Sequence, residues 1–178
     1  MTGTPPGPEE ALIAASELTI ADGAEVSPDA RIFPSSRGTR IVIGRFTRVM
    51  EFAVIRAVGG TGDVVIGEHC FINPHCLLYS GNGIRLGNDV LLAPGTRVVP
   101  ANHAFTRRDV PIWSQGFQPS RGGVVIEDDV WVGANTVILD GAVIRRGAVV
   151  GAGSVVAGEV GEYSVWAGVP AKWIKMRV

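Results

Sequence analysis

A single period governs most of this sequence. From Ile126 to Val156 an aliphatic residue returns at every sixth position without a miss. Four positions after each of them stands a small or β-branched residue. The aliphatic series is Ile126, Val132, Ile138, Ile144, Val150 and Val156, and the small series is Val130, Thr136, Ala142, Ala148, Ser154 and Val160. An α-helix repeats about every 3.6 residues and a simple strand about every two, so neither accounts for this spacing.

A six-residue period is typical of the hexapeptide parallel β-helix, in which each hexad supplies one short strand and a bend. Three hexads close a coil of about eighteen residues, and successive coils stack about 4.8 Å apart. The same period runs through residues 66–98 and, less evenly, through 20–55. Gly133, Gly151 and Gly153 are expected to supply positive φ at the bends. We therefore predict an all-β fold, a parallel β-helix, and take its left-handed sense from what is known of this fold class.

Three segments depart from the repeat. Residues 1–18 begin rich in Pro and Gly and end in "ALIAASEL", which could form a short helix over the first coil. The hexad is also lost at 104–121, which must leave the wall as an extruded loop. After the β-helix of 19–165, residues 166–178 form a C-terminal tail or short helix. A solenoid exposes unpaired strand edges at both ends, so caps are expected there.

Composition excludes several classes of protein. Lys and Arg number 16 against 17 Asp and Glu, so a net charge of −1 provides no basic field for nucleic acid. No apolar run reaches the roughly 18 residues of a membrane span, and the N-terminus lacks the features of a secretion signal. Cys70 and Cys76 fall in small-residue slots of consecutive hexads, on different faces of a coil, so we expect packing and no disulfide. A soluble, cytoplasmic protein is the expectation.

His103 stands where the loop leaves the wall. Loops longer than about 12–15 residues in compact domains are usually functional or disordered, and Phe105 and Trp113 favour a packed, functional one. Imidazole is the side chain best suited to accept a proton near neutral pH, which makes His103 a candidate general base. From the residues alone, a turn histidine held by a backbone carbonyl remains the alternative.

Several ordered motifs resemble a known family. They are "FINPHC" at 71–76, "GNDVLLAPGTRVVPANH" at 87–103, "VVIEDDVWVGANTVILDGAVI" at 124–144, "VVGAGSVV" at 149–156 and "WAGVPAKWIKMR" at 166–177. Together they resemble the hexapeptide-repeat O-acetyltransferases of galactosides, maltose, and capsule or exopolysaccharide sugars. The resemblance implies a homotrimer that transfers acetyl from acetyl-CoA to a sugar hydroxyl, with its site between neighbouring subunits.

The resemblance also implies roles for single residues. His103 matches the general base and Asn73 matches an asparagine that binds the acceptor. Trp131 matches the indole that lines the cofactor slot, and the Ala134 N–H matches the donor to the oxyanion. From the residues alone, Trp131 could instead cover the wall, and Asn73 could only hold a bend, because Asn tolerates left-handed conformations.

The resemblance implies further residues that would contact coenzyme A. Ala152 matches a main-chain contact to pantetheine, and Lys172 and Lys175 match the basic residues near the CoA phosphates. Lysines are otherwise more often solvated surface charges. Where the family often carries Thr-Lys, this chain has Ala157-Gly158, so one cofactor contact is missing or replaced.

Two other functions were considered. Some hexapeptide β-helices are zinc carbonic anhydrases with three His ligands at subunit interfaces, and this chain has His69, His75 and His103. Because His69 and His75 occupy different faces of a coil, we predict no metal site. A non-catalytic scaffold is the second alternative, and it leaves the ordered motifs without a reason.

Overall fold

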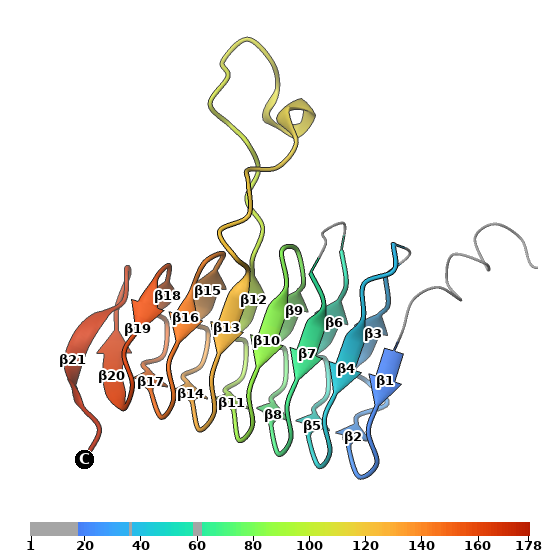
Figure 1. Cartoon of the computed structure of the whole chain (residues 1–178), viewed down its shortest axis with the longest axis vertical. Helices are drawn as coiled ribbons and strands as arrows, with labels where there is room; N and C mark the ends of the chain where they lie inside the picture. The colour runs from blue at the N-terminus through green and yellow to red at the C-terminus, as the bar shows by residue number, and fades with distance from the viewer. Residues whose placement is uncertain (1–17, 36, 59–61) are drawn as a thin grey trace, which may run out of the picture.

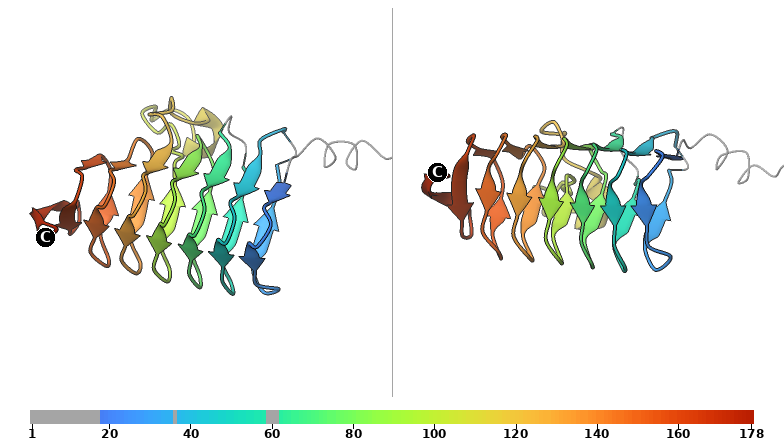
Figure 2. Two further views of the ribbon diagram at one scale, coloured as in Figure 1. Left: turned by 60° about the horizontal axis from the view of Figure 1, so that its bottom comes forward. Right: turned by 90° about the horizontal axis from the view of Figure 1, so that it is seen from below.

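The fold is a left-handed parallel β-helix, seen in a computed structural model that describes residues 18–35, 37–58 and 62–178 (Figure 1). Its strands form three sheets, and the chain visits sheet A, sheet B and sheet C in turn. We call the bends between them corner A–B, corner B–C and corner C–A. The predicted fold class is confirmed. The coils stack along one axis, with one long excursion from the stack (Figure 2).

The strands are short, because each hexad must also supply a bend. Sheet A consists of β1 (Leu18–Ile20), β4 (Ile41–Ile43), β7 (Val64–Ile66), β10 (Ile84–Leu86), β13 (Val124–Ile126), β16 (Val143–Ile144) and β19 (Glu159–Val160). Sheet B consists of β2 (Glu25–Val26), β5 (Arg48–Val49), β8 (Phe71–Ile72), β11 (Leu91–Leu92), β14 (Trp131–Val132), β17 (Val149–Val150), β20 (Ser164–Ala167) and β21 (Lys172–Met176). Sheet C consists of β3 (Arg31–Phe33), β6 (Val54–Arg56), β9 (Leu77–Tyr79), β12 (Arg97–Val99), β15 (Val137–Leu139) and β18 (Val155–Val156).

The repeat sets the register and fills the core. Ile126 pairs with Ile144 and Val132 with Val150, so residues eighteen apart stack as the period predicts. Every member of the aliphatic and small series from Ile126 to Val160 is buried. The buried hydroxyls of the small series serve the corners: Ser154 donates to the Gly151 carbonyl at 2.6 Å. The core is therefore a column of aliphatic layers lined by small residues at the bends.

The glycines of the bends act in two different ways. Gly153 has φ of 68°, as expected, but Gly133 and Gly151 do not have positive φ, so that expectation was wrong for them. Both are needed for close approach of the next coil. A Cβ on Gly133 would lie 2.5 Å from the Ala152 nitrogen, and one on Gly151 would lie 2.8 Å from the Ala167 Cβ.

The excursion at corner C–A, which we call the arm (residues 101–122), stands away from the coil (Figure 1). Its stem is a narrow antiparallel ribbon, in which Ala104 N–H donates to the Gly116 carbonyl at 3.0 Å and Gln118 N–H to the Asn102 carbonyl at 2.8 Å. A 3-10 helix, η1 (Ile112–Gln115), forms its far end. The predicted extruded loop is therefore an ordered projection with its own hydrogen bonds.

Asp140 ties the base of the arm to the coil. Its buried carboxylate, with 2% of the residue exposed, accepts Arg121 N–H at 2.8 Å and Gly123 N–H at 3.0 Å. The Asn82 side-chain amide donates to it at 3.1 Å. Three donors from two segments thus meet at one carboxylate, where the chain returns from the arm to the wall.

Replacing Asp140 with Ala should destabilise the protein by about 1–3 kcal/mol, because two buried backbone N–H groups lose their acceptor. Urea unfolding measures this loss, and limited proteolysis should show faster cleavage within the arm. Asp109→Ala is the matched control, since that exposed carboxylate pairs with Arg107 on the surface and its loss should leave the urea midpoint nearly unchanged. Equal effects of the two variants would contradict the role given to Asp140.

The C-terminal tail is a strand, so the helical option raised from sequence is wrong. β21 pairs antiparallel with β20 and closes the last edge of sheet B. Arg177 then reaches back to the Asp129 carboxylate at 2.9 Å and the Gly147 carbonyl at 3.1 Å. The predicted N-terminal cap falls outside the described residues, apart from Leu18, which begins β1. Among the described residues no helix is long and apolar enough to span a membrane.

Candidate active site

Six of the seven predicted site residues lie on one strip of the molecule. The strip comprises the outer face of sheet B and the adjoining corner B–C. Asn73 follows β8, Trp131 lies on β14, Ala134 and Ala152 follow β14 and β17, and Lys172 and Lys175 lie on β21. The fold therefore brings together residues that are about a hundred positions apart in sequence, in the order expected for one elongated ligand.

Besides that of Glu51, two backbone N–H groups at the same position of corner B–C have no acceptor among the described residues. They belong to Ala134 and Ala152, which lie one coil apart, because Gly153 N–H donates to the Ala134 carbonyl at 2.8 Å. The two coils before them carry Pro94 and Pro74 at the same corner position. Proline has no N–H, so the coil does not need a donor there. Ala134 and Ala152 therefore leave two amides available to a ligand.

Trp131 remains 53% exposed on the outer face of sheet B. It pairs in register with Leu91, itself 42% exposed, on one side and with Val149 on the other. The indole thus packs on the wall with one side and leaves a large apolar surface beside corner B–C. Such a surface suits a flexible, largely apolar ligand arm.

Asn73 contributes to the wall through its amide group. Its Nδ2 donates to the Leu92 carbonyl at 2.9 Å, and its backbone N–H donates to the same carbonyl at 3.2 Å. The left-handed residue of this bend is His75, with φ of 61°. Asn73 therefore links two coils by its donors and has its side-chain oxygen left as an acceptor.

Lys172 and Lys175 extend the strip toward the C-terminal end. Both are exposed and neither forms an ion pair within the described parts of the chain. Ala157 and Gly158, where the family pattern has Thr-Lys, line a cavity of about 210 Å³ at this end, together with Trp166 and Pro170. The departure in sequence thus coincides with a cavity whose lining includes neither lysine.

His103 lies apart from the strip, in the stem of the arm. Its Nδ1 is 3.2 Å from the Gly116 carbonyl, and its ring stacks on Phe117 with centroids 4.6 Å apart. A carbonyl can only accept, so Nδ1 carries the proton in this contact and Nε2 is left with a lone pair. Gly116 adopts φ of 76° and ψ of −146°, which favours glycine, and the sequence pattern gave no sign of this contact.

Within one chain, His103 does not lie next to the strip. His103 belongs to corner C–A, whereas Asn73, Ala134 and Ala152 belong to corner B–C, with sheet C between them. One side of the coil is six residues long, or at most about 20 Å. A reaction that needs both parts therefore needs a second copy of the chain.

Residues 123–158 match the family model "Bacterial transferase hexapeptide (six repeats)". These residues run from β13 to the end of β18, where the hexads are perfectly regular. The matched stretch is about a fifth of the chain and is similar to that family.

Relatives of this hexapeptide chain carry acetyltransferase names. WbbJ of Escherichia coli (strain K12), provisionally named a lipopolysaccharide biosynthesis O-acetyl transferase, is 35% identical over 65% of this chain and 62% of its own length. Rv3034c of Mycobacterium tuberculosis (strain ATCC 25618 / H37Rv), provisionally named an acetyltransferase, is 34% identical over 78% of this chain and 45% of its own. The chain thus spans less than two thirds of these relatives.

Solved structures share the hexapeptide coil. A variant of AntD, an N-acyltransferase from Bacillus cereus in complex with dTDP-4-amino-4,6-dideoxyglucose and coenzyme A, superimposes with a TM-score of 0.76. It is 26% identical, over 95% of this chain and 88% of that one. The acetyltransferase VCA0836 from Vibrio cholerae gives a TM-score of 0.55 at 25% identity, over 90% of this chain and 73% of that one.

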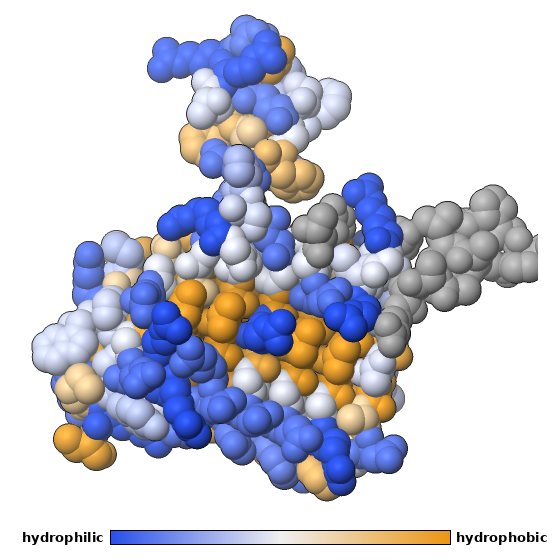
Figure 3. Space-filling view, viewed as in Figure 1, coloured by the Kyte–Doolittle hydropathy of each residue, from blue (hydrophilic) through white to orange (hydrophobic). Residues whose placement is uncertain are grey.

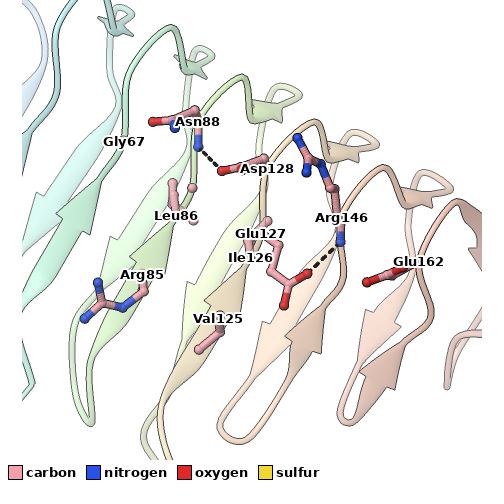
Figure 4. Close-up of a pocket in the computed structure, with 11 residues that line it drawn as sticks. Gly67, Arg85, Leu86, Asn88, Val125, Ile126, Glu127, Asp128, Arg146 and Glu162 are labelled. Carbon is pink, nitrogen blue, oxygen red and sulfur yellow. Dashed lines mark hydrogen bonds between the residues drawn. The ribbon is translucent and has the colours of Figure 1, made fainter.

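A second hollow lies on corner A–B, away from every predicted site residue (Figure 4). This groove of about 500 Å³ is lined by both acidic and basic side chains. Glu127 accepts Arg146 N–H at 2.9 Å and pairs with Arg145, whose guanidinium lowers the pKa of this carboxyl. Asp128 accepts Asn88 N–H at 2.7 Å. These carboxylates join neighbouring coils, so we assign the groove a structural role.

The side chains that could bind a metal ion lie on different corners of the coil. His69 lies at corner A–B, His75 at corner B–C and His103 at corner C–A, so the three histidines cannot meet in one chain. Within the described ranges no group of three His, Cys, Asp or Glu side chains could hold a metal ion. Cys70 and Cys76 are buried free thiols, and burial raises the pKa of Cys76 to about 11.

Proposed function

We propose that the protein transfers an acetyl group from acetyl-CoA to a hydroxyl of a sugar or saccharide precursor. The observation that carries this proposal is the alignment of two free backbone amides, an exposed indole and two unpaired lysines along one strip. Such a strip suits pantetheine beside Trp131, with its thioester at Ala134 and its phosphates near Lys172 and Lys175. The names of the relatives support the same chemistry.

We propose His103 as the general base. Its Nε2 takes the proton of the acceptor hydroxyl as that oxygen attacks the thioester carbonyl. The Ala134 N–H donates to the oxyanion that forms, and Asn73 positions the acceptor. When the tetrahedral intermediate collapses, the C–S bond breaks and the imidazolium returns its proton to the CoA thiolate. No covalent acyl-enzyme is needed, because both substrates are held together.

The proposed assembly is a homotrimer in which the arm of one copy brings His103 to corner B–C of its neighbour. The face of the molecule shown in Figure 3 carries an apolar band. Val42, Val65, Val125 and Val143 lie in one row across sheet A, in register with Arg85, and are partly exposed. Apolar bands of this kind mark interaction surfaces. Light scattering measures the mass of the assembly. The proposed compartment is the cytoplasm.

The test is release of CoA thiol from acetyl-CoA in the presence of free sugars, amino sugars, oligosaccharides and nucleotide-linked sugars, with mass spectrometry of the product. Amino sugars belong in the panel because AntD is an N-acyltransferase solved with an amino sugar nucleotide. We expect a product heavier by one acetyl group with at least one saccharide. Absence of turnover with the whole panel, or stoichiometric zinc in the purified protein, would overturn the proposal in favour of a scaffold or a carbonic anhydrase.

A further inference from the structure

A stacked aromatic pair lies on corner B–C, on the N-terminal side of the strip. Phe52 and His75 stack with centroids 5.2 Å apart and an interplanar angle of 16°. Both occupy the left-handed position of the bend, with φ of 60° and 61°. This backbone conformation is unfavourable for a bulky side chain. Phe52 is also 53% exposed, so this ring gains little from burial in the folded chain.

The pair lies on the same corner as the proposed reaction centre, in the stack of bend residues that runs along corner B–C. Successive left-handed positions on this corner are Phe52, His75, Gly95 and Asn135, joined coil to coil by backbone hydrogen bonds such as Asn135 N–H to the Pro94 carbonyl at 3.0 Å. At about 4.8 Å per coil, His75 lies about 10 Å and Phe52 about 14 Å from Asn135, the neighbour of Ala134. This distance exceeds the reach of one pyranose ring bound at the thioester.

A nearly identical pair on corner A–B shows what distinguishes this one. Phe46 and His69 stack at 5.1 Å and 19°, and Phe46 is 48% exposed. The Arg45 guanidinium lies 5.4 Å from the Phe46 ring centroid, and a Cβ built on Gly23 would lie 2.7 Å from that ring. Phe46 therefore contacts Arg45 and Gly23 of its own chain in addition to His69. No cation covers Phe52 among the described residues.

From these observations, and resting on the proposed function, we propose that Phe52 and His75 form a subsite for a second ring of the acceptor. The acetylated sugar occupies the coil between His75 and Ala134, and the ring attached to it extends past His75 and stacks on the face of Phe52 that His75 does not cover. Aromatic side chains bind flat rings, either the apolar face of a pyranose or a nucleobase, largely through stacking. The preferred acceptor is thus an oligosaccharide or a nucleotide-linked sugar, not a free monosaccharide.

The test compares wild type, Phe52→Ala, Phe52→Trp and the matched control Phe46→Ala on three forms of the active sugar: free, within an oligosaccharide, and nucleotide-linked. Phe52→Ala should raise KM for one or both extended acceptors about 5- to 50-fold and leave KM and kcat for the free sugar unchanged. Phe52→Trp should retain the wild-type KM, and Phe46→Ala should change none of these values. Which extended acceptor loses affinity identifies the ring as a pyranose or a base.

Two results would overturn the subsite: equal changes for all three acceptors, or a Phe52→Ala protein whose mass in light scattering differs from wild type, which would assign the ring to a contact between copies. If the wild type acetylates nothing, the proposed function fails by itself. Calorimetric titration of the same oligosaccharide and nucleotide-linked sugar into wild type and Phe52→Ala then decides the subsite. Binding weakened by Phe52→Ala supports it, and unchanged or absent binding removes it.

Discussion

Replacing His103 with Ala lowers turnover about 10²- to 10⁴-fold while the coil stays folded, if His103 is the general base. Its side chain is exposed in the arm and contributes nothing to the aliphatic column, so thermal unfolding should be nearly unchanged. The thiol-release assay gives the rate, and circular dichroism gives the melting temperature. A His103→Ala protein with wild-type turnover would remove the assignment.

A mixing experiment tests whether two copies build one site. His103→Ala and Ala134→Pro chains, each carrying a different tag, are co-expressed and mixed assemblies are purified. A site made of His103 from one copy and Ala134 from the next should regain activity at about a third of the interfaces, one in each mixed trimer. A site contained within one chain regains none. Activity in the mixture of two inactive chains would therefore establish the shared site, and its absence would place both parts in the same copy.

Ala134→Pro should lower kcat about 10²- to 10³-fold, because it removes the N–H proposed to stabilise the oxyanion. The substitution suits the backbone, since Pro94 and Pro74 occupy the same position in the two preceding coils. Stability should therefore change little, which urea unfolding verifies. A normal kcat in a folded Ala134→Pro protein would exclude the amide as a catalytic donor.

Three controls separate the missing N–H from the added ring. Ala134→Gly keeps the donor and should retain activity. Pro94→Ala adds an N–H one coil away and should leave kcat unchanged. Ala152→Pro removes the second free amide, proposed to contact pantetheine, and should raise KM for acetyl-CoA more than it lowers kcat.

The sequence predicts the wall well, because the signal for it is local. Each hexad carries its own inward aliphatic residue and small corner residue, and all of those from Ile126 to Val160 are buried. The tail was less predictable. Residues 172–176 become a strand because the open edge of sheet B offers backbone partners, a tertiary effect that no local pattern reports.

The sequence motifs predict individual residues of the candidate site, but they do not predict which residues surround them in the folded chain. Motifs mark Trp131 and Ala134, but no spacing links His103 to Gly116 and Phe117, which hold its ring from the other side of the arm. Likewise, Phe52 and His75 occupy bends where glycine or asparagine would be expected. Contacts that oppose local preference are visible only once the chain is folded.

The arm is inserted without disturbing the coil. Leu86 pairs with Ile126 in the same register in which it pairs with Ile66 on its other side, although the whole arm lies between β12 and β13. Because the ladder continues across the insertion, lengthening or replacing the arm need not move a single layer of the wall. A foreign arm grafted at residues 101 and 122 should therefore leave the coil, and the strip along sheet B, in the same register.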